Sequence, residues 1–345
     1  MKHGNIAIFV PHNGCPHQCS FCNQVSITGI QEQPAPKDVT DAIQAAVNHK
    51  SHETMQLELA FFGGSFTALD HDYMVSLLEA AQPFVTGGTI KGIRISTRPD
   101  AIDASVLQCL KQYGVTAIEL GAQSMLDTVL TVNQRGHTAR QVREASALIK
   151  TFGFELGLQM MTGLYGDTVQ GAKQTAIEIA KCKPDTVRIY PTVIMRHTYL
   201  GQLYESGKYD TLSLEETIDL CSELLAFFEQ EQIRVIRLGL HSSPELERDR
   251  LAGPWHPALR ELCESRRYRN AILQDLEHSF VIGKKIELFI HPKDYSKAVG
   301  QKKSNLQFFT SMGYHIEIKT KETIQRNRFL LAYADKEQKG VEVCG

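Results

Sequence analysis

Three cysteines near the start of the chain have the spacing best suited to chemistry. Cys15, Cys19 and Cys22 follow the pattern C-x3-C-x2-C, and the next cysteine, Cys109, lies far downstream. Three thiolates cannot complete a four-cysteine zinc site, but each can bind one iron of a cubane [4Fe-4S] cluster and leave the fourth iron open. S-adenosylmethionine (SAM) could chelate that iron through its amino and carboxylate groups and accept an electron from the reduced cluster.

Two other uses of these cysteines stay open. A zinc site could take His12 or His17 as its fourth ligand, although structural zinc usually draws on two separated pairs of ligands. A disulfide framework fits less well, because the eight cysteines are scattered and the chain does not start with a secretory signal.

The cysteine run, with Phe21 directly before the last thiol, resembles the signature of the radical SAM superfamily. The resemblance implies that Cys15, Cys19 and Cys22 hold a catalytic [4Fe-4S] cluster and that Phe21 lies near the bound SAM. It also implies a one-electron donor of the flavodoxin or ferredoxin type.

Further residues that could surround SAM follow later strand-like runs. Gly63 and Gly64 let the backbone come close to a ligand, although a Gly-Gly pair is often only a turn. Arg135 can bind a carboxylate through two hydrogen bonds, unless it forms a surface ion pair. The remaining candidates offer polar or apolar contacts to ribose, adenine or substrate: Ser96, Arg98, Gln123, Met161 and Gly163. For Ser96 the alternative is helix capping, and for Met161 it is the barrel core.

The elements that must position these residues are strands and helices in alternation. Strand-like runs are expected at 5–10, 56–62, 92–97, 116–120, 155–161, 186–189 and 234–238, with helical patterns between them. Such alternation predicts an α/β fold of parallel β/α units, whose functional loops gather at the carboxyl ends of the strands. The pattern alone does not separate a full eight-unit barrel from a partial one. The radical SAM resemblance favours the partial (β/α)6 barrel of the TIM type.

Later motifs resemble one branch of the superfamily. Residues 119–138, 188–196, 207–209 and 237–240 are similar to the radical SAM domain of the elongator protein three family, and the resemblance covers roughly residues 5–270. That family modifies the wobble uridine of transfer RNA, which implies an RNA substrate. The first cysteine gap is longer in that family. The family also has a carboxyl-terminal acetyltransferase domain, for which the last ~70 residues are too few. The resemblance therefore implies the radical step and not the family's product.

The end of the chain is basic. Residues 260–345 hold 16 Lys and Arg against 11 Asp and Glu, whereas residues 1–259 hold 21 against 28. The region around 286–319 resembles the KH fold of the transcription factor NusA, in which a glycine turn between two helices clamps a nucleic-acid backbone. The resemblance implies RNA contacts from Lys297, Gly300, Lys302 and Lys303, with the lysines facing solvent. The alternative is a small α/β cap with a solvated basic turn.

Together these features predict a radical SAM barrel domain at 1–255, and a connecting helix with a small KH-like domain at 256–345. We expect a cytoplasmic enzyme of transferase or oxidoreductase type that modifies transfer or ribosomal RNA. No apolar run approaches the ~20 residues of a membrane helix, so no membrane partner is expected. Two alternatives stay open: a radical SAM enzyme that acts on a porphyrinogen or another small molecule, and a non-enzymatic RNA-binding metalloprotein.

Overall fold

The computed structural model describes residues 2–11, 15, 18–23, 32–48, 55–334 and 341–343. The possible zinc ligands His12 and His17 lie outside these residues. The chain divides into two compact units. The first comprises Met1–Leu214 and Phe228–Pro257, and the second comprises Glu215–Phe227 and Ala258–Gly345. Within the described residues, no helix is both long and apolar enough to cross a membrane.

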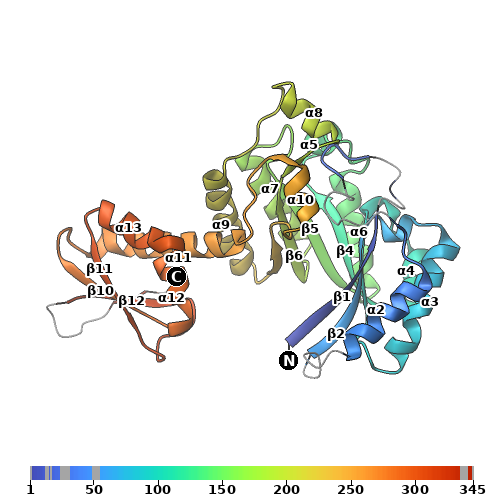
Figure 1. Ribbon diagram of the computed structural model, residues 1–345, viewed down its shortest axis with the longest axis horizontal. Helices are drawn as coiled ribbons and strands as arrows, with labels where there is room; N and C mark the ends of the chain where they lie inside the picture. The colour runs from blue at the N-terminus through green and yellow to red at the C-terminus, as the bar shows by residue number, and fades with distance from the viewer. Residues whose placement is uncertain are drawn as a thin grey trace. The chain divides into compact units, whose positions relative to one another are not determined.

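The first unit is built on one sheet of parallel strands in the order β1-β2-β3-β4-β5-β6-β8 (Figure 1). The strands are β1 (Lys2–Val10), β2 (Met55–Gly63), β3 (Ile93–Thr97), β4 (Val115–Gln123), β5 (Glu155–Thr162), β6 (Thr186–Pro191) and β8 (Arg234–Leu238). The helices between them in the sequence are α2 (Pro36–Asn48), α3 (His71–Thr86), α4 (Ala104–Gln112), α5 (Asp127–Val132), α6 (Ala139–Thr151), α7 (Val169–Lys181) and α9 (Leu214–Gln230), and most of α9 belongs to the second unit. Short 3-10 turns occur at Phe66–Ala68 and Pro99–Ala101.

The sheet curls into a half-barrel. The guanidinium of Arg188 on β6 lies 5.0 Å from the ring centre of Phe62 on β2, although β3, β4 and β5 lie between these strands. Only a strongly curved sheet brings such distant strands into contact across one face. The predicted α/β class and partial TIM-type barrel are confirmed, and the strand-like run expected at 234–238 forms the seventh parallel strand, β8.

The two faces of this sheet differ in chemistry. Side chains alternate along a strand, so each strand contributes to both faces. One face is apolar and fully buried, with Leu59, Ile93, Ile95, Ile118, Leu120, Leu156, Leu158, Val187 and Ile189 among its residues. Helices α2, α6 and α7 contact the strands. The concave face carries charged and polar side chains instead, and it contains the candidate site.

Side-chain caps mark the start of two helices. The side chain of Asp70 accepts a hydrogen bond from the Tyr73 amide at the start of α3, and that of Asp103 accepts one from the Val106 amide at the start of α4. Gly114 follows α4 with a φ of +80°, which a glycine adopts at little cost.

The segments after β6 and β8 contain elements that the sequence did not predict. These are β7 (Ile194–Met195), α8 (Tyr199–Glu205), α10 (Pro244–Asp249) and β9 (Arg250–Ala252). β7 and β9 pair antiparallel in a small separate sheet. Gly253 continues β9 with a φ of +107°, and a Cβ there would lie 2.8 Å from the carbonyl oxygen of Thr192. The turn that follows β9 is therefore packed closely against the carboxyl end of β6.

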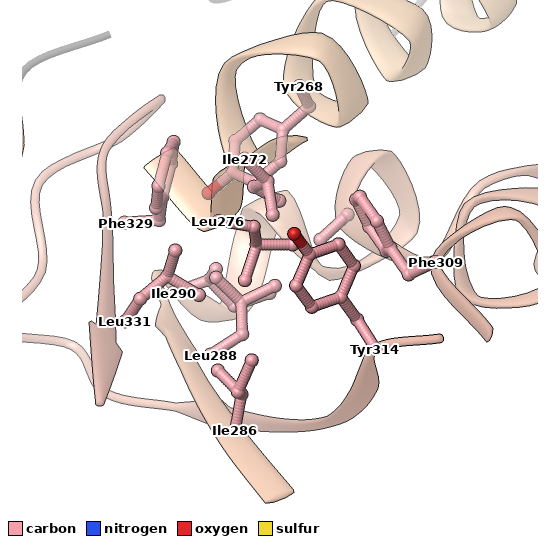
Figure 2. Packing of buried hydrophobic residues seen from close by; sticks show 11 residues of the cluster. Tyr268, Ile272, Leu276, Ile286, Leu288, Ile290, Phe309, Tyr314, Phe329 and Leu331 are labelled. Carbon is pink, nitrogen blue, oxygen red and sulfur yellow. The ribbon is translucent and has the colours of Figure 1, made fainter. Parts of the chain in front are cut away.

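The second unit includes a four-stranded sheet in the order β11-β10-β12-β13. Its elements after residue 258 are α11 (Leu259–Ser279), β10 (Lys285–Ile290), α12 (Tyr295–Val299), α13 (Ser304–Ser311), β11 (His315–Thr320), β12 (Phe329–Tyr333) and β13 (Val341–Val343), with 3-10 turns at Pro292–Asp294 and Gln301–Lys303. Figure 2 shows its core, in which Ile272 and Leu276 of α11 pack against Leu288 and Ile290 of β10. These four side chains are fully buried, so this small unit has a core of its own.

Candidate active site

The cysteine loop follows the carboxyl end of β1. Cys19 is buried, while Cys15 and Cys22 are half-buried, and the Cys22 amide donates to the Cys19 carbonyl oxygen at 3.1 Å. Burial raises the pKa of the Cys15 thiol, and the neighbouring Cys19 raises it further. Among the described residues, no three His, Cys, Asp or Glu side chains, these cysteines included, are close enough to hold a single metal ion.

Hydrogen bonds attach this loop to distant parts of the barrel. The hydroxyl of the fully buried Ser20 donates to Oδ1 of Asn133 at 2.7 Å, and the Ser20 amide donates to the Asn133 carbonyl oxygen at 3.1 Å. The Leu200 amide at the start of α8 donates to the Ser20 carbonyl oxygen at 2.7 Å. The middle of the cysteine loop is thereby fixed between the end of α5 and the start of α8.

Arg135 connects the cysteine loop to β4. Its Nη1 donates to Sγ of Cys19 at 3.0 Å and its Nη2 donates to the Gly121 carbonyl oxygen at 2.7 Å. The side chain is only 7% exposed, and its Nε has no hydrogen-bond partner among the described residues. The alternative of a surface ion pair is therefore wrong. A buried guanidinium beside a cysteine remains able to receive an anionic group.

The carboxyl end of β4 is bulged. The pairing register with β5 shifts between Gly121 and Gln123, and Gln123 has a φ of +63°. Its side-chain Oε1 is buried and has no hydrogen-bond partner in the described part of the chain. An unpaired buried amide oxygen is costly, so this atom is suited to accept a hydrogen bond from a ligand.

His137 supports the same bulge and was not among the predicted site residues. It is 5% exposed, and its Nε2 lies 3.3 Å from the Ala122 carbonyl oxygen. Burial, followed by the charge of Arg135, lowers the pKa of His137 to about 4. The imidazole is therefore neutral near pH 7 and carries its proton on Nε2, facing the carbonyl. Its place directly after Arg135-Gly136 was the signal available in the sequence.

The glycines predicted to approach SAM sit where β1 and β2 come together. Gly63 has a φ of +108°, and a Cβ there would lie 2.9 Å from the Val10 carbonyl oxygen. The Gly64 amide donates to the same oxygen at 2.7 Å. The close approach of the two strands already requires a glycine at position 63, and the contact with SAM stays a prediction.

The candidates after β3 have protein partners. Oγ of Ser96 accepts a hydrogen bond from the Gln159 side chain at 3.4 Å, and Arg98 is held by two hydrogen bonds to Asp100, at 2.9 and 2.8 Å. The N-cap of α4 is Asp103, so the capping alternative for Ser96 is wrong. Ser96 stays a candidate for a hydrogen bond to the ribose of SAM. The guanidinium of Arg98 already donates two hydrogen bonds to Asp100, which leaves it fewer donors for a ligand.

The last three candidates lie near the carboxyl end of β5 and in the cysteine loop. Met161 is half-buried, and Gly163 has a φ of +71° with its carbonyl oxygen bonded to the Tyr209 hydroxyl. Phe21 packs against a cluster that includes Leu200 and lies 5.9 Å from the Arg135 guanidinium. Phe21 thus helps to hold the cysteine loop, and its contact with SAM stays a prediction.

The concave face of the sheet carries a buried ionic network. Glu119 on β4 is 1% exposed and forms ion pairs with Arg188 at 2.6 Å and with Arg94 at 3.5 Å. The amide of Gln159 donates to the same carboxylate at 3.0 Å. Burial opposes the charged form of Arg188, but Glu119 outweighs it, and the pKa of Arg188 is raised.

The basic turn of the second unit has an uncommon backbone. Gly300, Lys302 and Lys303 have φ angles of +76°, +51° and +65°, and both lysines are exposed. Lys297 differs: its side chain is 22% exposed and pairs with Glu264 at 2.9 Å. The expectation that all three lysines face solvent is wrong for Lys297.

The curled parallel sheet and the cysteine loop at its carboxyl edge define a class of enzyme. The sequence model of the Radical SAM superfamily matches residues 9–178, and the model of the Radical SAM C-terminal domain matches residues 184–269. The chain belongs to the radical SAM superfamily and is a radical SAM enzyme.

Particular relatives are found in one branch. The chain is 29% identical to elongator complex protein 3 of Bos taurus over 315 residues, which cover 80% of this chain and 56% of the relative. It is 26% identical to a tRNA uridine(34) acetyltransferase of Methanocaldococcus jannaschii over 256 residues, which cover 63% of this chain and 47% of that relative. The chain thus spans about half the length of these relatives.

Solved structures agree on the fold. The archaeal elongator protein 3 of Methanocaldococcus infernus superimposes with a TM-score of 0.54 at 21% identity, covering 72% of this chain and 62% of that one. SuiB of Streptococcus suis bound to S-adenosylmethionine superimposes with a TM-score of 0.50 at 14% identity. The match covers 71% of this chain and 52% of SuiB.

Proposed function

We propose that this radical SAM enzyme holds a [4Fe-4S] cluster on Cys15, Cys19 and Cys22, binds SAM beside it, and modifies transfer or ribosomal RNA. The observation that carries the proposal is the position of Arg135, whose guanidinium lies between the Cys19 thiol and the bulged end of β4. A fixed positive charge at that point favours both an anionic cluster and a carboxylate.

The residues present fit these groups. Burial favours the protonated thiol at Cys15, and an iron that replaces the proton removes that cost. Arg135 Nε and Gln123 Oε1 are buried polar atoms without hydrogen-bond partners among the described residues, one a donor and one an acceptor. SAM offers a carboxylate for the donor and ribose hydroxyls for the acceptor. A cluster held by Cys15, Cys19 and Cys22 would supply the single electron needed for reductive cleavage of SAM.

The chain's own residues orient these ligands. Arg135 holds the carboxylate, and neutral His137 fixes the Ala122 carbonyl so that Gln123 keeps its left-handed backbone. Phe21 packs against the apolar cluster around Leu200 and thereby helps to hold the cysteine loop in place. The electron comes from a small donor protein of the flavodoxin or ferredoxin type.

The RNA part of the proposal is supported by the relatives and by the second unit. The relatives named above include a tRNA uridine(34) acetyltransferase. The exposed Lys302 and Lys303 lie on a glycine turn between two helices, where an RNA backbone could be held.

Mass spectrometry of nucleosides tests the function. Total RNA from a deletion strain should lack one modified nucleoside that the parent contains. The parent gene should restore it, and a gene with Cys19→Ala should not. Identical nucleoside profiles in deletion and parent strains would contradict an RNA substrate and favour a porphyrinogen or another small molecule.

A further inference from the structure

Arg135 places a positive charge directly beside the cysteine loop. Its Nη1 donates to Sγ of Cys19 at 3.0 Å, and both residues are only 7% exposed. An electrostatic interaction is stronger in such a place than in water, because little solvent screens it. Negative charge that arises at the Cys19 sulfur therefore arises beside a fixed guanidinium.

The described partners of this guanidinium include no carboxylate. Nη2 donates to the Gly121 carbonyl oxygen at 2.7 Å, and the guanidinium carbon lies 5.9 Å from the ring centre of Phe21. Nε has no hydrogen-bond partner among the described residues. A carbonyl oxygen and an aromatic ring carry no net charge, so these contacts leave the positive charge of Arg135 unbalanced.

A second buried arginine shows the opposite arrangement. Arg98 follows β3, is 4% exposed, and donates from Nε and Nη2 to the two carboxylate oxygens of Asp100 at 2.9 and 2.8 Å. This paired geometry balances the charge of Arg98 within its own loop. Of these two arginines, Arg135 is the one whose charge remains available to the cysteines.

The reduction potential of an iron–sulfur cluster depends on net charge, on hydrogen bonds to the sulfurs and on exposure to solvent. Arg135 affects each of these at Cys19, since it brings a positive charge and an N–H donor to a buried sulfur. A cation beside the sulfur favours the more negative, reduced form. The contact of Arg135 with Cys19 is therefore one that changes how easily an electron is taken up.

The same side chain can bind SAM through a different edge. Nη1 donates to Cys19, whereas the unpaired Nε and a neighbouring Nη hydrogen form the fork that matches a carboxylate. A carboxylate held beside a cluster opposes the arrival of an electron, because like charges repel. A guanidinium between the two offsets this repulsion.

We propose that Arg135 sets the reduction potential of this site: it raises the potential of a cluster held by Cys15, Cys19 and Cys22, both before and after SAM binds. The electron comes from the donor protein, which is oxidised in turn, and no bond forms or breaks in this step. The inference rests on the proposed function, because it takes these cysteines to hold a [4Fe-4S] cluster. It gives Arg135 an effect that exists without SAM.

Redox titration of the reconstituted full chain without SAM is the first test. The midpoint potential is followed by the absorbance and the electron paramagnetic resonance of the cluster. Arg135→Gln removes the charge and keeps a polar amide. At the parent's midpoint, the ratio of reduced to oxidised cluster should be about tenfold lower in this variant, which corresponds to about 59 mV for one electron. Equal midpoints in the parent and Arg135→Gln overturn the inference.

Arg140→Gln is the matched control for overall charge. Its side chain is 78% exposed on α6, so solvent screens the charge that is removed. This variant should have the midpoint potential of the parent. A midpoint lowered as much by Arg140→Gln as by Arg135→Gln would show that only net charge matters, which also overturns the inference.

Arg135→Lys separates the charge from the fork, and it replaces Arg135→Gln if that variant holds no cluster. Lysine keeps the positive charge but does not present two parallel donors to a carboxylate. The lysine variant should keep a midpoint near that of the parent while its affinity for SAM falls. A lysine variant about tenfold harder to reduce than the parent would show that the charge is not the cause, and it overturns the inference.

The same titrations with saturating SAM are the second test. Nη1 and the Nε edge serve different partners, so the difference in midpoint between the parent and Arg135→Gln should persist. The SAM concentration is raised for the variant until binding is complete. A difference that disappears with SAM would show that the guanidinium leaves Cys19 when SAM binds, which overturns the effect proposed for the SAM-bound state.

These outcomes are distinct from a failure of the proposed function. A parent protein that holds no iron–sulfur cluster contradicts the proposed function itself. A parent protein that holds the cluster and cleaves SAM, but whose midpoint potential Arg135→Gln leaves unchanged, overturns only the role of Arg135 in setting that potential.

Discussion

Nη1 of Arg135 lies 3.0 Å from Sγ of Cys19, although 116 positions separate the two residues in the chain. This contact joins the loop after β1 to the turn after α5, and a second hydrogen bond of the same side chain reaches β4. The cysteine loop is therefore positioned by the rest of the barrel and not by its own sequence alone. The proposed cluster and the proposed SAM carboxylate share this one guanidinium.

The cluster assignment predicts a metal content. Anaerobically reconstituted protein should hold about four irons and four sulfides, with a brown absorbance that dithionite bleaches. Cys19→Ala should lose the cluster. Cys109→Ala replaces a half-buried thiol of α4 and should keep the cluster. A protein that binds one zinc and no iron would contradict the assignment.

Arg135 should control the affinity for SAM. Arg135→Ala should raise the dissociation constant by a factor that corresponds to about 2 kcal/mol or more, because a charged, paired hydrogen bond is lost. Arg140→Ala is the control, since its side chain is 78% exposed on α6. Equilibrium binding of SAM to the reconstituted protein measures both. SAM binding by Arg135→Ala at the parent's affinity would assign the carboxylate to another residue.

His137 should make stability depend on pH. Its pKa is about 4 in the folded protein and about 6.5 in an unfolded chain, so the unfolded state binds the proton more readily between these values. Stability is therefore fully present above about pH 6.5 and is lost as the pH falls towards 4. Between pH 7 and pH 5 the loss should be about 2 kcal/mol.

Urea unfolding of the parent and of His137→Gln at pH 7 and at pH 5 measures how much His137 contributes to the pH dependence of the unfolding free energy. Gln can still donate to the Ala122 carbonyl oxygen but does not titrate. The variant should therefore lack about 2 kcal/mol of the pH dependence and should bind SAM nearly as the parent does. An equal pH dependence in both proteins would show that His137 is not the titrating group.

The basic turn can be tested without disturbing its fold. Lys302 and Lys303 have positive φ angles, which glycine adopts freely. Lys302→Gly with Lys303→Gly should therefore preserve or raise thermal stability while reducing RNA affinity and lowering the salt slope by up to about two units. Lys297→Ala should instead lower stability, because it leaves Glu264 without this partner. RNA binding unchanged by the double glycine variant would reject the turn as an RNA contact.

The buried network predicts a large stability effect. Glu119→Gln would leave Arg188 and Arg94 with less negative charge in a buried place, and breaking such a pair costs about 3–5 kcal/mol. Denaturant unfolding should show this loss. Glu144→Gln, whose carboxylate is 63% exposed on α6, should change stability by less than about 1 kcal/mol.

The regular elements were predictable, and the contacts of the site were not. Apolar runs such as 155–161 predicted the strands because the outer face of the sheet is buried. β7 and α8 were missed because these elements are short and depend on pairing and packing with distant segments. The Cys19 contact of Arg135 and the ion pair of Lys297 arise from residues brought together by folding. Sequence spacing carries no signal for them.

The order of the two units along the chain limits where it can be divided. The second unit takes Glu215–Phe227, most of α9, from the middle of the sequence. Arg266 of α11 pairs there with Glu215 and Asp219, and the Ser222 hydroxyl bonds to the Cys263 carbonyl oxygen at 3.1 Å. A fragment that begins at residue 258 would lack these partners, and the side of α11 that contacts α9 would be exposed to water. A gene split at that point would therefore express an incomplete module, and any transplant of the basic turn onto another protein must carry α9 with it.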